Sequence, residues 1–285
     1  MTILKVILLA IVQGLAELLP VSSSAHVIVA EKLMGLDPSA PDMTLLLVLL
    51  HTGTMFAVIA YFWRSWKGAY FASRAAFQGF VARLLSATVL AGIVGEALKK
   101  LIERTLFRGA PKDEIELLFG RLDLIAPALA AAGVLILIAG LVARQQTDDE
   151  TTPLTFGQSA WMGVVQGLAL PFRGFSRSGS TISAAMLAGA AKVRAEQFSF
   201  ALAVVLTPAV VGLEALRLGK SAAAAHIDLK ASVASSLLGM IFSFFAGLLA
   251  LKWLSRWLET GRWYLFGIYC LVASCVVWWL HMRGF

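Results

Sequence analysis

Two stretches of the chain, about half its length apart, share a layout that is unusual for an apolar protein. Each runs from an apolar segment through a proline-containing break into a cluster of hydroxyl side chains, and then back into apolar sequence. The first covers residues 13–26 and the second covers 166–181. The arms beside each break are short and carry polar residues, so neither arm suits a bilayer crossing of about 20 apolar residues. We therefore predict two helical hairpins with polar tips.

The rest of the chain is too apolar for a soluble domain. Of its 285 residues, 59% are hydrophobic and 14% are charged, which indicates a multi-spanning helical membrane protein. The formal charge of +7 suits anionic lipid headgroups or an anionic substrate. Because the chain has no polar domain, we expect no nucleic-acid partner. Cys270 and Cys275 do not share a helix face, which argues against a disulfide or a metal site.

Each predicted hairpin is followed by three apolar runs that are long enough to cross a bilayer. The hairpins are expected over Ile3–Met34, with its break at Pro20, and over Phe156–Ala190. The expected spans are Thr44–Phe62, Leu84–Ile102, Leu124–Val142, Phe198–Leu216, Ala231–Leu254 and Trp263–His281. The small-residue site Ser23-Ser24-Ala25 imitates a signal-peptide cleavage site, but the recurrence of the hairpin later in the chain argues against processing.

One hairpin and three spans thus occur twice in a single integral membrane domain, 1–285. The repeats are 1–142 and 156–285, joined by a polar linker at 143–155. A hairpin returns to the membrane face from which it entered, whereas three crossings end on the opposite face. The second half of the chain therefore begins on the face opposite to the start of the first half. The predicted fold is therefore an all-α polytopic membrane protein with an inverted-topology repeat. Irregular backbone inside a membrane is tolerated only when it is buried or lines a wet cavity, so we expect function where the two tips meet.

Hydroxyl side chains follow both breaks, at the expected start of each returning helix. They are Ser22, Ser23, Ser24, Ser176, Ser178 and Thr181. Simple capping of free backbone N–H groups is one interpretation. Three hydroxyls at each of two helix starts exceed what capping needs, and helix N-termini also bind anions such as phosphate. Both interpretations stay open at this point.

Two ionisable residues near the breaks point to chemistry. An intramembrane arginine costs about 2.5–3.5 kcal/mol on insertion scales, so Arg177 should face a cavity or an interior partner. Its planar fork suits a phosphate; the alternative is a structural pair with Glu17. Glu17 shares a helix face with Gln13 and can orient water, accept a proton or hold a cation. Arg173 is closer to the break and is either interfacial or a second phosphate contact.

Histidines supply further candidates. His26 lies just beyond the first serine cluster and can serve as an acid or a nucleophile, although a hydrogen-bonded structural histidine is the alternative. His51 and Thr52 lie inside an expected span and are weaker candidates for lining a cavity. The charged residues of 192–196 have the pattern of a solvated loop.

These motifs resemble those of the undecaprenyl-diphosphate phosphatases of the bacitracin-resistance type. The run Gln-Gly-Leu-Ala-Glu-Leu-Leu-Pro-Val-Ser-Ser at 13–23 resembles the family's (Glu/Gln)-x-x-x-Glu stretch followed by Pro-Val-Ser-Ser, and His26 falls on the family's histidine. The run Gly-Phe-Ser-Arg-Ser-Gly-Ser-Thr at 174–181 resembles its Pro-Gly-x-Ser-Arg-Ser-x-x-Thr stretch. Gln13 stands where many members have Glu, Ala25 replaces a frequent Gly, and Arg173 replaces the Pro of Pro-Gly.

The resemblance implies removal of the terminal phosphate from undecaprenyl diphosphate, which recycles the lipid carrier for cell-wall synthesis and confers bacitracin resistance. It implies a bacterial inner membrane, a divalent cation (Mg2+ or Ca2+) and a site open to the periplasmic face. Carried over by position, Glu17, His26 and Arg177 would be the essential set, with Glu17 as the metal ligand. Ser23, Ser176, Ser178 and Thr181 would line the phosphate site. Ser22 and Ser24 are expected to bind phosphate as well, with support from Gln13, Gln166 and Arg173.

Several alternatives remain open from the sequence. His26 could attack and form a phospho-enzyme, Glu17 could activate water while His26 protonates the leaving group, or Ser23 could be the nucleophile. The competing class of function is a transporter or flippase of an anionic polyprenyl phosphate lipid, because inverted repeats with broken helices are common in transporters. A homodimer is compatible with these observations.

Overall fold

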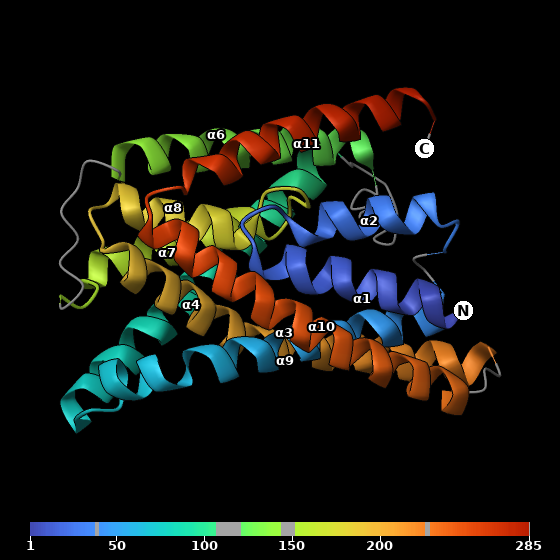
Figure 1. Cartoon of the computed structure of the whole chain (residues 1–285), viewed down its shortest axis with the longest axis horizontal. Coiled ribbons are helices and arrows are strands. Elements are labelled where there is room, and N and C mark those ends of the chain that lie inside the picture. The colour runs from blue at the N-terminus through green and yellow to red at the C-terminus, as the bar shows by residue number, and fades with distance from the viewer. Residues whose placement is uncertain (38–39, 107–120, 144–151, 226–228, 285) are drawn as a thin grey trace.

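The described part of the chain consists of helices and the turns between them (Figure 1). The computed structural model describes residues 1–37, 40–106, 121–143, 152–225 and 229–284. The helices of the first half are α1 (Ile3–Leu18), α2 (Ser23–Leu33), α3 (Pro41–Tyr70), α4 (Arg74–Leu106) and α6 (Leu122–Ala143). Those of the second half are α7 (Phe156–Ala169), α8 (Arg177–Leu187), α9 (Lys192–Ala225), α10 (Leu229–Glu259) and α11 (Tyr264–Met282).

Five of the described helices are long and apolar enough to cross a membrane. Their candidate spans are Asp42–Tyr70, Arg74–Thr105, Leu122–Ala143, Ser232–Glu259 and Tyr264–Met282. The prediction of a polytopic helical membrane protein is therefore confirmed. The sixth expected span, Phe198–Leu216, falls inside α9, whose side chains after Pro208 are described only in part. Most of the expected linker, residues 144–151, lies outside the described residues.

The first hairpin breaks because Pro20 cannot continue α1. Proline lacks a backbone N–H and pushes the residue before it out of the helical region. Leu19 is accordingly extended, with φ −77° and ψ 151°. Ser22, at the start of α2, takes φ +67°, a left-handed conformation that costs a non-glycine residue about 1–3 kcal/mol. The chain therefore turns back sharply within four residues.

The second hairpin begins at a capping box and breaks at a glycine. The Thr155 hydroxyl accepts from the Gln158 backbone N–H, and the Gln158 side chain accepts from the Thr155 N–H. Such reciprocal bonds satisfy the free donors at a helix start. Gly174 takes φ +105°, and a Cβ there would lie 2.5 Å from the Ile125 carbonyl oxygen of α6. Only glycine meets both demands without strain, so this turn is seated directly against α6.

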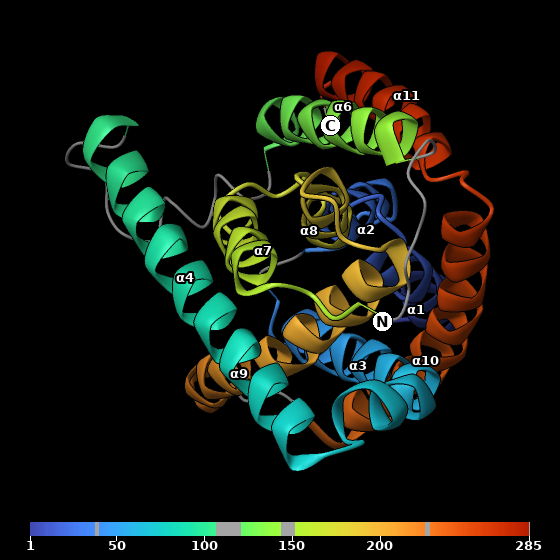
Figure 2. The same cartoon turned by 90° about the vertical axis from the view of Figure 1, so that its left-hand side faces the viewer.

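The two hairpins point toward each other from opposite ends of the molecule. In Figure 1 the hairpin of α1 and α2 extends inward from the right and that of α7 and α8 from the left. Figure 2 shows both enclosed by the longer helices, with α6 and α11 side by side along one flank. Their breaks touch: a Cβ on Gly179 would lie 3.2 Å from the Pro20 ring. The tips therefore meet in the interior.

Small residues let each hairpin approach its neighbouring long helix closely. A Cβ on Gly14 would lie 2.7 Å from the Ser243 carbonyl oxygen of α10, and one on Gly163 would lie 2.4 Å from the Ala87 carbonyl oxygen of α4. Helices pack by such small-residue contacts where burial against lipid gives no hydrophobic driving force. Thus α1 is fixed against α10, and α7 is fixed against α4.

The charged segment 192–196 is not a solvated loop, so that expectation is wrong. It forms the first turn of α9, and the Glu196 side chain is turned inward with the residue only 3% exposed. There the Ser255 hydroxyl of α10 donates to Glu196 Oε1 at 2.7 Å. A buried carboxyl group requires such a partner. The partner lies 59 positions away along the chain, so the local sequence gave no sign of it.

Candidate functional site

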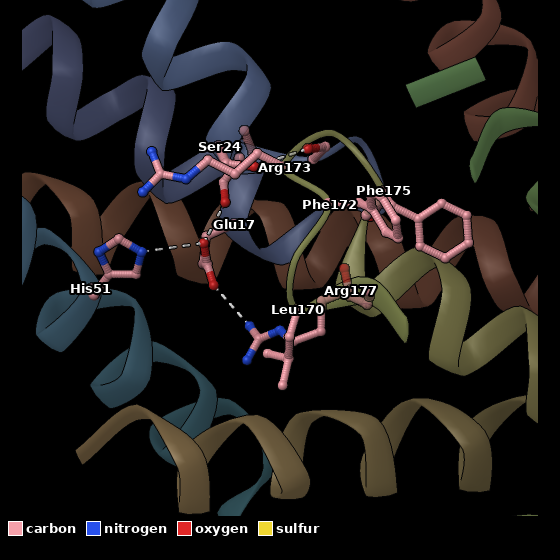
Figure 3. Close-up of a pocket in the computed structure, with 14 residues that line it drawn as sticks. Glu17, Ser24, His51, Leu170, Phe172, Arg173, Phe175 and Arg177 are labelled. Carbon is pink, nitrogen blue, oxygen red and sulfur yellow. Dashed lines mark hydrogen bonds and ion pairs between the residues drawn. The ribbon is translucent and has the colours of Figure 1, made fainter. Parts of the chain in front are cut away.

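A cavity of about 270 Å3 lies where the two breaks meet. Both hairpins contribute to its lining, and one side chain comes from α3. The lining residues are Ala16, Glu17, Ser22, Ser23, Ser24, His51, Ala169, Leu170, Phe172, Arg173, Phe175, Ser176, Arg177 and Ser178. Figure 3 shows Glu17 near the middle of the labelled side chains. The expectation that polar tips converge on one chamber holds for most of the predicted residues.

The Glu17 carboxylate is the hub of the cavity. Arg177 donates from Nη2 to Glu17 Oε1 at 2.8 Å. The Ser23 hydroxyl donates to Oε2 at 2.5 Å, and Gln13 Nε2 donates to the same oxygen at 3.1 Å. The Glu17 side chain is 14% exposed. A carboxylate that is so buried is tolerated because both of its oxygens are hydrogen-bonded and a guanidinium balances its charge.

Arg177 begins α8 and reaches across from the second hairpin to the first. The structural alternative foreseen for this arginine, a pair with Glu17, is therefore present. It does not exclude a role with a ligand, because both side chains line the cavity and the arginine side chain is 26% exposed. A guanidinium with remaining donors can hold a carboxylate and a phosphate at once.

The serines divide into different roles. The Ser176 hydroxyl accepts from the Gly179 backbone N–H at 3.2 Å, so it caps α8 as simple capping predicts. Ser22 makes no side-chain cap bond within the described chain; its hydroxyl lies 3.3 Å from that of Ser24. Ser23 instead donates to Glu17. Capping therefore accounts for Ser176 but not for the first cluster.

Three predicted residues lie behind the cavity rather than in its lining. Gln13 is buried and acts through its bond to Glu17. Thr181 lies within α8, and its buried hydroxyl is 2.9 Å from the Arg177 carbonyl oxygen and 2.6 Å from the Ser199 hydroxyl of α9. The Gln166 amide is fully buried, and neither of its polar atoms has a hydrogen-bond partner among the described residues.

His26 also lies off the cavity, in contrast to the expectation that it would share a chamber with Glu17 and Arg177. Its Nδ1 is 2.8 Å from the Ser22 carbonyl oxygen, and its Nε2 is 2.7 Å from the Tyr269 hydroxyl of α11. Ser23 and His26 are three residues apart and so lie near the same face of α2, but Ser23 bonds Glu17 of α1 whereas the longer His26 ring reaches Tyr269 of α11.

His51 is the histidine that does line the cavity. Its Nε2 lies 3.7 Å from Glu17 Oε2, and its Nδ1 bonds the Leu47 carbonyl oxygen one turn back. The only sequence signal for it was a polar residue inside an apolar span. Figure 3 shows Arg173 on the side of Glu17 opposite Arg177. Arg173 and Arg177 thus both line the cavity.

The donor set for a metal ion is sparse. Among the described residues there is no group of three or more His, Cys, Asp and Glu side chains that could hold one. Glu17 is the one carboxylate in the described cavity lining, and its oxygens already accept bonds from Arg177, Ser23 and Gln13. Mg2+ and Ca2+ take about six or more oxygen ligands. The residues fit a cation that is held mainly by phosphate oxygens, not one held by the protein alone.

Comparison with known proteins gives a consistent family. Residues 6–276 match the family described as "Bacitracin resistance protein BacA". The chain is 56% identical over 281 residues to "Undecaprenyl-diphosphatase 2" of Acinetobacter baylyi, with 97% of each chain covered. It is 33% identical to "Undecaprenyl-diphosphatase 2" of Burkholderia orbicola, covering 98% of each. It is 34% identical to "Undecaprenyl-diphosphatase" of Desulfatibacillum aliphaticivorans, covering 96% of this chain and 97% of the relative.

Proposed function

The chain belongs to the bacitracin resistance protein BacA family, and we propose that it hydrolyses undecaprenyl diphosphate to undecaprenyl phosphate and inorganic phosphate. The observation that carries the proposal is the cavity lined by both hairpins, in which Ser23 and Arg177 bond the Glu17 carboxylate and Arg173 also lines the wall. The names of the relatives favour a diphosphatase over a transporter of anionic lipid. The reaction would return the lipid carrier to cell-wall synthesis and so confer resistance to bacitracin.

Ser23 is the best-supported nucleophile of the three that the sequence left open. Its hydroxyl donates to Glu17 Oε2 at 2.5 Å, which is the geometry of a nucleophile beside its base. In the first step Ser23 Oγ bonds to the terminal phosphorus, its proton passes to Glu17, and the bond to the bridging oxygen breaks. Undecaprenyl phosphate leaves. Water then cleaves the phosphoserine, releases inorganic phosphate and restores the hydroxyl.

Arg177 and Arg173 would hold the two phosphate groups. Phosphoryl transfer depends mainly on positioning and on charge stabilisation, and arginine binds phosphate oxygens bidentately. The N-terminus of α8 and the hydroxyls of Ser176 and Ser178 face the same cavity, so free N–H groups can add to the anion site. As Arg177 engages a phosphate, its hold on Glu17 weakens, and the carboxylate becomes a stronger base.

His26 would act from outside the cavity, through the hydrogen bond from its Nδ1 to the Ser22 carbonyl oxygen. A divalent cation, Mg2+ or Ca2+, would enter with the diphosphate, and Glu17 is the carboxylate available to it. Bound there, it would neutralise charge on the phosphate oxygens. Gln13 keeps Glu17 in place, and Thr181 anchors the first turn of α8.

The proposal places the protein in a bacterial inner membrane with its cavity open to the periplasm. The finer architecture belongs to it too: inverted repeats 1–142 and 156–285 in one domain, joined by the linker at 143–155. Its support is the opposed approach of the hairpins and the matching contacts of α1 with α10 and α7 with α4. A homodimer would hold two such cavities.

The test is phosphate release from undecaprenyl diphosphate by the purified full-length protein in detergent. Mg2+, Ca2+ and a chelator are compared, with Glu17→Gln as the inactive control. We expect release that depends on the cation, and a Ser23 phosphopeptide when the reaction is quenched at early times. No release with either cation overturns the proposal. Movement of polyprenyl phosphate across liposomes without any hydrolysis would favour the transporter.

A further inference from the structure

The helix α11 contacts the first hairpin through two consecutive side chains at the point where that hairpin breaks. The Tyr269 hydroxyl is 2.7 Å from His26 Nε2, and the two rings stack with centroids 5.7 Å apart and planes 13° apart. The Cys270 thiol donates to the Pro20 carbonyl oxygen at 3.4 Å. The body of α11 packs against α6 instead, where Gly267 lies against Gly133. These two side chains are thus specific contacts on the turn.

The bonds of His26 fix which ring nitrogen carries the hydrogen. The Ser22 carbonyl can only accept, so Nδ1 must be the donor to it. In the neutral ring Nε2 is then the acceptor, and the Tyr269 hydroxyl donates to it. A second hydrogen bond of this kind sets both the tautomer and the ring orientation of a histidine. The Tyr269 hydroxyl therefore holds the far edge of the ring, so that His26 presents Nδ1–H to the Ser22 carbonyl in one orientation.

The Ser22 carbonyl is held at a strained residue. Ser22 is the one non-glycine residue with positive φ among the residues that the structure describes. Such a conformation persists only where its surroundings enforce it. Its carbonyl accepts from both His26 Nδ1 and the His26 backbone N–H, at 2.8 and 3.3 Å. The next residue, Ser23, donates its hydroxyl to Glu17, so the turn aims the nucleophile at its base.

We propose that Tyr269 is a positioning residue for the hydrolysis: through His26 it holds the Ser22 turn that directs the Ser23 hydroxyl to Glu17. This inference rests on the proposed function. Tyr269 is 47% exposed at the outer face of α11, so its ring lies at the surface while its hydroxyl points inward to the histidine. Its effect should appear in the chemical step rather than in substrate binding, because neither Tyr269 nor His26 lines the cavity.

The kinetic test compares Tyr269→Phe with Tyr264→Phe, the same deletion of a hydroxyl on the same helix away from His26. We expect Tyr269→Phe to lower kcat about tenfold with KM changed less than about twofold, as for an interaction that matters only in the transition state. Tyr264→Phe should stay within about twofold of the wild type in both constants. An unchanged kcat in Tyr269→Phe overturns the inference.

A double-mutant cycle separates positioning from plain packing. Asn at position 26 keeps a donor near the place of Nδ1 but has no group that reaches Tyr269, so His26→Asn should retain more activity than His26→Ala. Because Tyr269 acts through His26, adding Tyr269→Phe to His26→Asn should change kcat less than about twofold. Full, independent losses from the two changes would contradict this coupling.

A measurement without substrate keeps this inference distinct from the proposed function. In protein labelled with 15N-histidine, the His26 signal is identified as the one lost in His26→Asn among the chain's four histidines. We expect the Nδ1–H tautomer in the wild type. In Tyr269→Phe we expect the Nδ1 proton to exchange faster with solvent, because the ring loses its second hydrogen bond, with no such change in Tyr264→Phe. An unaltered exchange rate of the Nδ1 proton in Tyr269→Phe overturns the positioning role, whereas absent phosphate release by the wild type overturns the hydrolysis itself.

Discussion

Glu17 of the first hairpin and Arg177 of the second form a 2.8 Å ion pair across 160 positions of sequence. The pair joins the two breaks at the cavity, and each hairpin supplies the charge that balances the other's. Removing one partner of a buried pair leaves an uncompensated charge, which costs more than the pair itself contributes. The same two side chains therefore couple the integrity of the site to the contact between the halves of the chain.

The charge of Glu17 can be tested apart from its shape. Glu17→Gln keeps the size of the side chain and one accepting oxygen, but it loses the charge and the second acceptor, and it cannot take the Ser23 proton. We expect kcat to fall by about 100-fold to 10000-fold, the range for loss of a general base. The measurement is steady-state phosphate release, with thermal unfolding in the same detergent as a check on folding. Retention of more than about a tenth of the wild-type kcat would remove Glu17 from the role of base.

Arg177→Lys keeps the positive charge but loses the planar fork. We expect kcat/KM to fall at least about 100-fold, as when one donor to a developing negative charge is removed, because Lys cannot bond Glu17 and a phosphate bidentately. Arg177→Ala should be at least as impaired and should also unfold at a lower temperature. A kcat/KM for Arg177→Lys close to the wild-type value would show that charge alone suffices.

Arg173 should affect substrate affinity more than turnover. It flanks the cavity opposite Arg177, and a contact that is equal in the ground and transition states changes KM alone. We expect Arg173→Gln to raise KM for undecaprenyl diphosphate about tenfold, with kcat within about threefold of the wild type. Arg121→Gln is the matched control, because Arg121 is exposed and paired with Asp123 outside the cavity. Equal kinetic constants for Arg173→Gln and the control would contradict the role.

Gly163 should be required for the seating of the second hairpin. A Cβ there would lie 2.4 Å from the Ala87 carbonyl oxygen of α4, whereas a Cβ on Gly68 meets nothing within 4 Å. Overpacking of this kind destabilises by about 1–3 kcal/mol, so Gly163→Ala should lower the unfolding temperature. Gly68→Ala should leave it unchanged or raise it slightly, since alanine favours helix. Equal melting of the two variants would show that α4 yields to the added methyl group.

The sequence predicted the hairpins well because their signals are local. Pro20 marks the first break, and both hairpins lie within their predicted ranges. Several long helices extend beyond their predicted spans: Thr44–Phe62, for example, lies within α3 (Pro41–Tyr70). Hydropathy reports the apolar part of a helix, whereas the helix itself continues through polar and interfacial residues such as those after Phe62.

The site was predicted only in part because its contacts are not local. The polar run after each break led to Glu17, Ser23 and Arg177, which do meet. His26 was expected with them because it lies near the serines in sequence, but its ring contacts Tyr269 of α11 instead. Conversely, His51 joins the cavity from α3. His51 is 34 positions from Glu17 and His26 only 9. Which of them faces the carboxylate depends on how the helices pack, and this cannot be predicted from their spacing in the sequence.

The cavity has a volume of about 270 Å3, slightly below the range of about 300–1000 Å3 that is usual for small-molecule sites. An undecaprenyl tail is far too large to enter such a space, so most of it must stay among the acyl chains of the bilayer during turnover. The enzyme would then recognise its substrate by the charged diphosphate head alone, and carriers of different isoprenoid length would be hydrolysed with similar kcat/KM.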